Sequence, residues 1–304
     1  MKKSLLPLPF ILIGCLISCQ KKSDLVGTRP YENDAFKQYW YAGKAEIDAY
    51  VLNQSRYGEN RKGKAVLIFI TEDFSKKKQV KLDNPSVANN DNVNVLKMNF
   101  TKNFVTGIYP YSMMLSVFTP VSRNQYPNTI KVTMSSQEWC GHVFDEMNLH
   151  ANKFNVKSYS YLEREGDQNF TIKKVLLEDE LWNIIRIDHQ SLPTGEINIL
   201  PGLFFFRLNL VNLKATKATA EKTESDSSFT YTVNYPEHER KLRIQFEKTF
   251  PYKILNWTEE FKEGNGKVML TSGVLDKTLY TDYWTKNKNE FNYLRDSLGL
   301  YTDH

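Results

Sequence analysis

The chain has 304 residues, and its 40 lysines and arginines outnumber its 35 aspartates and glutamates to give a formal net charge of +5. This weak basic excess neither demands nucleic acid nor supports binding through a basic patch. Hydrophobic residues make up 41% of the chain, which is enough to build a substantial core in one large β-domain or in two smaller ones.

The first residues have the pattern of an export signal. Lys2 and Lys3 precede an apolar run over residues 5–18, which is shorter than the stretch of about 20 residues that a spanning helix needs. The run ends on the sequence LISC (16–19), which resembles the lipobox of bacterial lipoproteins. The resemblance implies cleavage after Ser18, diacylation of the Cys19 thiol and acylation of the new α-amine.

A second cysteine competes for this role, because residues 12–15 (LIGC) also fit the lipobox pattern. Cleavage before Cys15 would leave the sequence LIS at the start of the mature chain, whereas Cys19 is followed at once by the polar residues 20–24. A tether that leaves a membrane should be polar, so we favour Cys19. An ordinary cleaved signal and an N-terminal transmembrane stub are the alternatives to a lipoprotein.

These observations predict a signal peptide over residues 1–18, a lipid-anchored tether over 19–33 and a single β-rich domain over 34–304. Position 20 is Gln rather than Asp, so nothing here resembles an inner-membrane retention signal, and no acidic cluster follows Cys19. We therefore expect an outer-membrane lipoprotein that faces the periplasm. After processing, Cys140 is left without a disulfide partner, and a lone cysteine is usually a buried, small apolar residue.

The first part of the domain is expected to be a helix followed by hairpins. Residues 34–43 predict a short helix that Asp34 starts and Gly43 ends. Alternating or β-branched runs then predict strands, and polar or turn-rich segments predict connections. The expected strands are 45–52, 64–74, 95–105, 108–119 and 129–136, with a long loop over 56–63 and a solvated loop over 75–94.

The second part combines a hairpin, helices and a β-meander. Residues 153–175 predict the hairpin, and 177–187 predict a helix whose acidic first turn suits the helix dipole. The apolar run 195–213, broken by a Pro-Gly pair, predicts two buried strands, and 214–228 predicts a polar loop. Further strands are expected at 229–235, 241–247, 254–261 and 267–273, followed by a helix near 280–298 that Gly299 ends.

The elements do not alternate as strand, helix, strand, so a parallel sheet is not expected. The sequence therefore predicts a mainly β (α+β) fold, in the form of a large curved antiparallel sheet or half-barrel. We expect a few short helices to cap this sheet and its concave face to be apolar. Some of the 17 Tyr, 18 Phe and 5 Trp should line that face, although antiparallel sheets need aromatic cross-strand pairs in any case.

Two parts of the chain are similar to a known group of proteins. The first part is YWYAGKAE (39–46) together with KAVLIFITEDF (64–74), and the second is SQEWCG (136–141). Both resemble uncharacterised Bacteroidota lipoproteins, and the likeness spans most of the mature chain. Members of that group are sometimes labelled septum formation inhibitor Maf. The sequence has no Ser-x-Arg-Arg phosphate loop after a strand, however, and a lipobox contradicts the cytoplasmic location of Maf proteins.

The order of the elements also resembles that of periplasmic half-barrels of the lipoprotein-carrier (LolA/LolB) type. The shared order is an early hairpin, a DELWNIIR helix before a Leu-Pro-x-Gly turn, and a late meander that ends in FPYKILNWTEEF. This resemblance implies a curved sheet that is able to hold an apolar chain.

The sequence EWCGH (138–142) is the sharpest candidate for chemistry. It is similar to the redox motif WCGPC but lacks the second cysteine, so disulfide exchange in the thioredoxin manner is not expected. Cys140 and His142, with Glu138 as an acid, would suit a hydrolase or transferase of envelope polymers. In a strand these two side chains share a face but lie about 6.5–7 Å apart along the chain. Packing of Trp139 and Cys140 beside a bulge or turn is therefore the favoured interpretation.

The remaining motifs point away from catalysis. The histidines are too scattered for a local zinc site, and no phosphate loop, GxGxxG or GxSxG is present, so we expect no metal and no cofactor. We expect a non-catalytic protein that is held on a membrane by its lipid and binds an apolar or envelope-derived ligand, such as a lipid or glycan, or an envelope protein. Nucleic acid is not an expected partner. A purely structural envelope lipoprotein is the remaining alternative.

Overall fold

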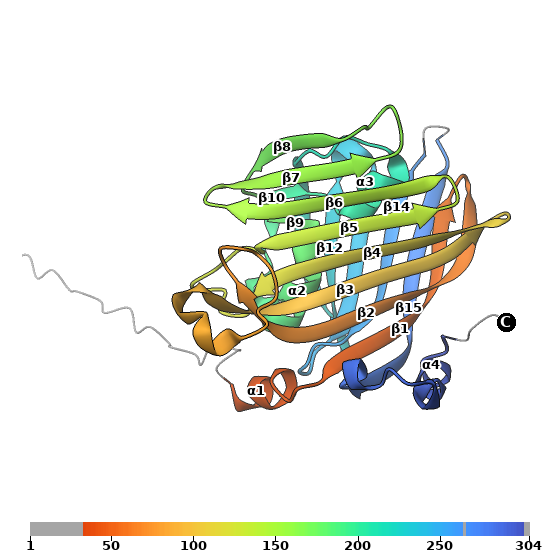
Figure 1. Ribbon diagram of the computed structural model, residues 1–304. Helices are drawn as coiled ribbons and strands as arrows, with labels where there is room; N and C mark the ends of the chain where they lie inside the picture. Colours follow the sequence, from red (N-terminus) through yellow and green to blue (C-terminus); the bar gives the residue numbers. More distant parts are fainter. Residues whose placement is uncertain (1–32, 264–265, 301–304) are drawn as a thin grey trace, which may run out of the picture.

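The computed structural model describes residues 33–263 and 266–300 (Figure 1). The predicted signal peptide, the Cys19 lipidation site and the tether up to residue 32 lie outside the described residues and stay predictions. The described part forms one sheet of 15 strands with four α-helices, which confirms the predicted mainly β fold. Among these residues, no helix has the length and apolar character that crossing a membrane requires.

Most strands follow one another along the chain as hairpins. In chain order they are β1 (Ala45–Arg56), β2 (Glu59–Ser75), β3 (Asn92–Thr106), β4 (Tyr109–Pro120), β5 (Lys131–Glu138), β6 (Gly141–His150), β7 (Lys153–Ser160), β8 (Gln168–Lys173), β9 (Leu176–Leu177), β10 (Gly195–Leu200), β11 (Thr216–Glu224), β12 (Ser228–Tyr235), β13 (Arg240–Glu247), β14 (Ile254–Lys262) and β15 (Val268–Thr281). The helices are α1 (Asp34–Trp40), α2 (Glu178–Asp188), α3 (Leu203–Asn209) and α4 (Tyr293–Ser297).

The first and last strands meet in the middle of the sheet. Its spatial order is β8-β7-β6-β5-β4-β3-β2-β1-β15-β14-β13-β12-β11-β10-β9. Neighbouring strands are antiparallel except for β9 and β10, which run parallel. Figure 1 shows the result, a trough in which β2 to β8 form one wall and β14 to β9 form the other, with β1 and β15 at the base.

The first hairpin is tighter than the sequence suggests. Tyr57 and Gly58 have φ angles of 56° and 76° and form a two-residue turn between β1 and β2. Positive φ at both turn positions matches the right-handed twist of the paired strands. The long loop predicted over 56–63 is therefore wrong, because residues 59–63 continue the ladder of β2 opposite β1.

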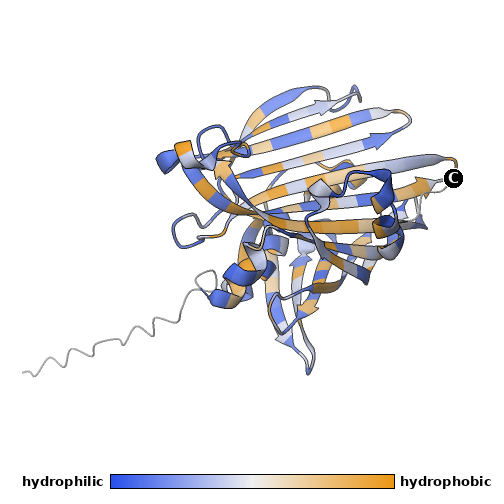
Figure 2. Cartoon of the chain, turned by 60° about the horizontal axis from the view of Figure 1, so that its bottom comes forward, coloured by the Kyte–Doolittle hydropathy of each residue, from blue (hydrophilic) through white to orange (hydrophobic). Residues whose placement is uncertain are grey.

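Helix α2 lies inside the trough and is buried on all sides. Its residues from Glu178 to Ile187 are all buried, and it packs against β3 and β4. Figure 2 shows hydrophobic and hydrophilic residues alternating along the strands, as expected when one face of a sheet is packed. The predicted concave apolar face and the helix over 177–187 are thus present, but α2 and α3 cover much of that face.

Buried ion pairs connect α2 to the sheet. Arg186 of α2 is ion-paired with Glu46 and Asp48 of β1, and none of the three side chains is exposed. Arg240 of β13 is ion-paired with Glu178 at the start of α2. Loss of either arginine would leave a buried carboxylate unpaired, which typically costs about 3–5 kcal/mol. These pairs therefore fix the position of the helix within the trough.

The acidic first turn of α2 is more than a favourable helix start. Glu178, Asp179 and Glu180 are all buried, and each has a partner. The backbone N–H of Leu203 donates to Asp179 Oδ2 at 3.1 Å, and that of Thr129 donates to Glu180 Oε2 at 2.9 Å. Burial, reinforced by the neighbouring Glu178 carboxylate, raises the pKa of Asp179 to about 8.

Two predicted elements in the second half are wrong. The run 195–213 holds one strand, β10, and then the helix α3 in place of a second strand. Residues 203–206 all enter the buried interior, and a helix satisfies the backbone of such a segment without a neighbouring strand. The loop predicted over 214–228 contains β11, in which Ala218 and Ala220 are buried between exposed polar residues.

The C-terminal segment packs on the outside of the sheet. Strand β15 continues to Thr281, and only residues Tyr293–Ser297 form α4, so the helix predicted over 280–298 is wrong. Tyr280 belongs to β15, and its ring stacks on that of Tyr39 with centroids 4.6 Å apart. Leu298 is buried in a small outer cluster beside β1 and β2. The apolar residues that suggested one helix therefore belong to a strand and to a separate covering segment.

Candidate functional site

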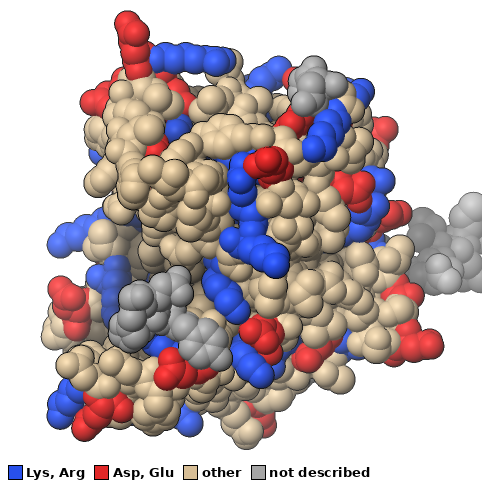
Figure 3. Space-filling view, turned by 90° about the vertical axis from the view of Figure 1, so that its right-hand side faces the viewer, with Lys and Arg blue, Asp and Glu red and all other residues tan. Residues whose placement is uncertain are grey.

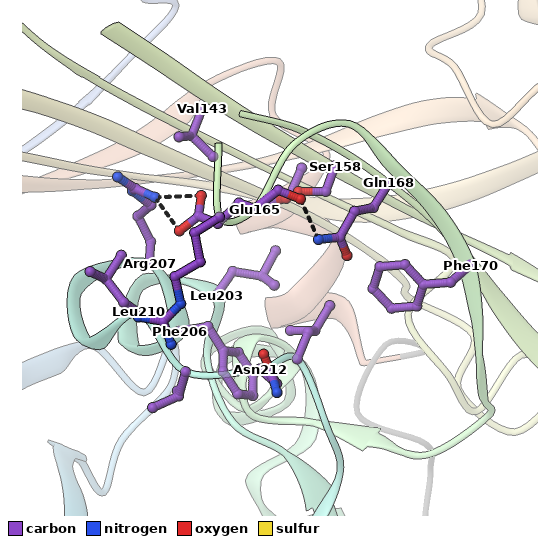
Figure 4. Close-up of a pocket in the computed structure, with 14 residues that line it drawn as sticks. Val143, Ser158, Glu165, Gln168, Phe170, Leu203, Phe206, Arg207, Leu210 and Asn212 are labelled. Carbon is purple, nitrogen blue, oxygen red and sulfur yellow. Dashed lines mark hydrogen bonds and ion pairs between the residues drawn. The ribbon is translucent and has the colours of Figure 1, made fainter. Parts of the chain in front are cut away.

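The sheet does not close on itself. Strand β8 pairs with β7 alone, and the two residues of β9 pair only with β10, so no ladder joins β8 to β10 in the described part of the chain. A pocket of about 270 Å³ lies beside this gap (Figure 4), between β6, β7 and β8 on one side and α3 with residues 210–213 on the other. We call it the seam pocket.

One part of the seam pocket is apolar. Val143, Leu203 and Phe206 belong to the buried core, which fixes their positions. Phe170 points inward from the edge strand β8 (Figure 4). The apolar lining consists of Val143, Phe170, Leu203, Phe206, Leu210, Val211 and Leu213. Leu210 and Val211 are 40% and 37% exposed and form part of the mouth.

Leu210 is held in a backbone conformation that is unfavourable for leucine. It ends α3 with φ 53° and ψ 38°, in the left-handed region. A non-glycine residue in this region costs about 1 kcal/mol or more, and Asn tolerates it better than Leu does. An apolar side chain is therefore placed at the mouth of the pocket although a polar residue would suit the local backbone better.

The opposite part of the pocket is polar and is held by one ion pair. Nη1 of Arg207 donates to both carboxylate oxygens of Glu165, at 2.9 and 3.1 Å (Figure 4). The Ser160 hydroxyl donates to Glu165 Oε2 at 2.6 Å, and the Gln168 side-chain amide donates to the Glu165 carbonyl oxygen at 2.6 Å. The loop between β7 and β8 is thereby tied to α3, which closes this end of the pocket.

Two further charged residues line the pocket. Burial raises the pKa of the Asp145 carboxyl, although hydrogen bonding to Ser158 opposes this change. Arg164 is exposed at the mouth and forms no ion pair with any described residue. The pocket therefore combines an apolar wall with a guanidinium group that is available to an acidic ligand.

The structure places the predicted site residues in and beside a tight turn. Trp139 and Cys140 form the turn between β5 and β6, as the favoured interpretation expected, but Trp139 is 68% exposed, so the packing expected of it is wrong. Cys140 is exposed, so the expectation of a buried cysteine is wrong. Its backbone N–H donates to Glu138 Oε2 at 2.7 Å, and the Tyr161 hydroxyl donates to Glu138 Oε1 at 2.7 Å. His142 is exposed on β6 and shares no hydrogen bond with Cys140 in the described structure.

This arrangement does not activate the thiol. A hydrogen bond to Glu138, together with the negative charge of that carboxylate, raises the pKa of Cys140. The thiolate, which is the nucleophilic form, is therefore less populated than in an ordinary cysteine. Glu138 and Cys140 come together, but the base that a Cys/His nucleophile needs does not join them.

The seam pocket was missed by sequence reasoning. Arg207 and Phe206 lie in the segment predicted as a strand, where their helical neighbours could not be foreseen, and Glu165 was assigned only to a hairpin turn. The signal that could have indicated this pocket is Arg207, a charged residue directly after the apolar run LFFF (203–206). Across residues 33–263 and 266–300, no three His, Cys, Asp or Glu side chains are grouped in a way that would hold a metal ion.

No family model and no curated protein matches this chain. Among solved structures, it is similar to a β-barrel-like protein of the domain of unknown function DUF1849 from Brucella abortus, with 10% identity, coverage of 78% of this chain and 98% of the other, and a TM-score of 0.44. It is also similar to immune modulator A of Aeromonas veronii, with 5% identity, coverage of 76% and 93%, and a TM-score of 0.18. Likenesses at this level carry no functional argument, and the resemblances to Bacteroidota lipoproteins and to LolA/LolB stay predictions.

Proposed function

We propose that this chain is a lipid-anchored protein of the bacterial outer membrane, facing the periplasm, and that it binds a small amphipathic ligand in the seam pocket without catalysis. The seam pocket is the single observation that carries the binding proposal. It has an apolar wall and a charged wall, and it lies where the sheet is left unpaired.

The size of the pocket limits the ligand. Sites for small molecules usually enclose about 300–1,000 Å³, so a pocket of about 270 Å³ suits a small molecule or one end of a larger one. An acyl chain would contact Phe170, Phe206 and Leu210, and an acidic head group would lie next to Arg164. A fatty acid or the end of a lipid has this combination of parts.

The anchor rests on the sequence alone. The lipobox at residues 16–19 supports lipidation of Cys19, and several acyl chains bind a membrane stably because each buried CH₂ contributes about 0.8 kcal/mol. Mass spectrometry of the protein purified from its native membrane tests this part. We expect a thioether-linked diacylglyceryl group on an N-terminal Cys19, and an intact Met1 would contradict it.

The binding part is tested with a fluorescent fatty acid. We expect 11-(dansylamino)undecanoic acid to gain fluorescence when it is titrated with the full chain. Leu210→Asn should weaken this binding by about 3- to 10-fold, because an apolar contact at the mouth is lost. Asn also suits the left-handed backbone at this position, so the variant should remain folded.

Matched control variants distinguish binding in the seam pocket from binding elsewhere on the protein. Leu270 is 41% exposed on β15 and does not line the pocket, so Leu270→Asn should leave the affinity unchanged. Arg164→Gln should weaken binding of the acid but not of the corresponding dansylated alcohol, whereas Arg295→Gln on α4 should change neither. Equal effects of the Leu210 and Leu270 variants would contradict binding in the seam pocket.

A further inference from the structure

Exposed apolar side chains collect at one end of the sheet. Strands β1, β3, β5 and β14 run in the same direction, so the turns that follow them lie at the same end. Tyr57, Ile108, Trp139 and Val268 occupy or adjoin these four turns and are 57%, 77%, 68% and 65% exposed. We call these four residues the hairpin rim.

Hydrogen bonds connect the first turn to its neighbours. The hydroxyls of Tyr57 and Tyr111 are hydrogen-bonded at 3.0 Å, which joins the first turn to the start of β4. Lys267 Nζ donates to the Gly58 carbonyl oxygen at 2.6 Å, and the Gly58 N–H donates to Glu263 Oε1 at 3.1 Å. The first turn is therefore bound to the turn after β14 on one side and to the start of β4 on the other.

Basic side chains lie among these apolar residues. The guanidinium of Arg56 covers the ring of Tyr57, with 4.1 Å between its central carbon and the ring centroid. Figure 3 looks onto this end of the molecule and shows a band of Lys and Arg side chains down its middle, beside uncharged surface. Around the first and last of these turns, five basic residues outnumber three acidic ones: Arg56, Arg61, Lys62, Lys262 and Lys267 against Glu59, Glu239 and Glu263.

We propose that the hairpin rim docks on the surface of an anionic lipid bilayer. Trp and Tyr are enriched at the interface between membrane and water, and binding at this depth grows with the buried apolar area and with attraction to anionic lipids. The rim supplies an exposed Trp, an exposed Tyr, two exposed aliphatic tips and an excess of basic residues. Separated tips of this kind enter a soft interface without needing a partner of matching shape.

The docked orientation brings the seam pocket to the membrane. Arg56 donates to the carbonyl oxygen of Leu208 at the end of α3, so the rim is joined to the helix that lines the pocket. The pocket mouth, with Leu210 and Val211, follows directly after α3. An acyl chain would therefore pass between the bilayer and the pocket over a short path.

The length of the proposed tether limits this orientation, and only this step rests on the proposed anchor. Helix α1 precedes β1 and therefore lies at the end of the sheet opposite the rim. Residues 19–33 span at most about 50 Å when extended. The 17 residues of β2, the longest strand, span roughly 55 Å. A fully extended tether is thus about 5 Å shorter than the longest strand, so the rim reaches the membrane that holds the lipid when the domain is tilted toward it.

Quenching of tryptophan by brominated lipids tests the proposal. The full chain is mixed with vesicles of phosphatidylethanolamine and phosphatidylglycerol whose acyl chains carry bromine. We expect quenching with these vesicles, loss of that quenching in Trp139→Phe, and retention in Trp284→Phe. Trp284 is a matched control because it is 44% exposed and follows the end of β15 away from the rim. Ile108→Ser, at a turn position that is 77% exposed, should reduce the quenching without affecting the fold.

The possible outcomes are distinct. Quenching that persists in Trp139→Phe, or that is equally strong with phosphatidylcholine vesicles, would overturn the proposal. So would an absence of quenching together with loss of a co-purifying protein in Ile108→Ser, because the rim would then bind protein. Failure of the anchor is detected separately by the mass of the mature chain, and failure of the seam pocket by the dansyl titration.

Discussion

Asp179 provides a sharp test of the polar interior. Its pKa is about 8 in the folded protein, against an ordinary value of 3.8, because the carboxyl is buried next to Glu178. Between these two pH values the folded protein keeps a proton that the unfolded chain releases, so stability must fall as the pH rises from about 4 to about 8. At about 1.4 kcal/mol for each pH unit, the full effect has an upper bound of about 6 kcal/mol.

The variant Asp179→Asn should remove this loss. Its side chain stays neutral at every pH, and its amide oxygen still accepts the Leu203 N–H that Asp179 accepts at 3.1 Å. We expect the variant to be more stable than the original protein by at least about 2 kcal/mol at pH 9, with a difference that shrinks toward pH 4. Urea unfolding of both proteins at pH 5, 7 and 9 measures this difference, in which the titration of groups far from Asp179 cancels.

The reasoning would be refuted if the two stability curves ran parallel between pH 5 and pH 9. The neighbouring carboxylate supplies the contrast, because Glu178 is ion-paired with Arg240 and Asp179 is not. Glu178→Gln should therefore destabilise the protein by about 1.5–3 kcal/mol at pH 7, the opposite sign from Asp179→Asn, because Arg240 loses a charged partner but keeps Glu259. Replacing each of these two adjacent acids by its amide would thus change the free energy of unfolding in opposite directions.

Two further predictions follow from contacts described above. Arg186→Met should lower the free energy of unfolding in urea by about 3–5 kcal/mol, because it leaves the buried Glu46 and Asp48 without their cation; a change below 1 kcal/mol would show that these carboxyls are already neutral. Cys140 should be alkylated by iodoacetamide in the folded protein, and Glu138→Gln should speed the reaction at pH 7.5 because the thiol pKa falls toward its ordinary value; an unchanged rate would contradict this cause.

The sheet could be predicted because its signals are local. A run such as 64–74 is rich in β-branched and aromatic residues, and consecutive runs are separated by turn residues, so a meander of hairpins follows from the sequence. The helix over 177–187 was also predicted, since its apolar residues recur with helical spacing. Local patterns of this kind do not reveal that its acidic residues are buried, because their partners, such as Arg240, come from distant strands.

The seam pocket could not be predicted for the same reason. Its walls come from β6 to β8 and from α3, which are far apart in the chain. The segment of α3 was predicted as a strand because a short apolar run such as LFFF fits a buried strand and a buried helix equally well. Only the tertiary surroundings decide between the two, since the segment enters an interior with no free strand to pair with. The exposed position of Cys140 likewise depends on the turn between β5 and β6; the sequence favoured a bulge or turn there but did not indicate that its side chains face the solvent.

The pairing of β1 with β15 has a consequence for the order of assembly. Each wall of the trough consists of strands that are close neighbours in the chain, whereas the base joins residues such as Asp48 and Thr278, which are 230 positions apart. Closing so large a loop costs chain entropy that the local hairpins avoid. The walls can thus form early, each on its own, and the two halves of the molecule acquire a common interior only when its terminal strands find each other.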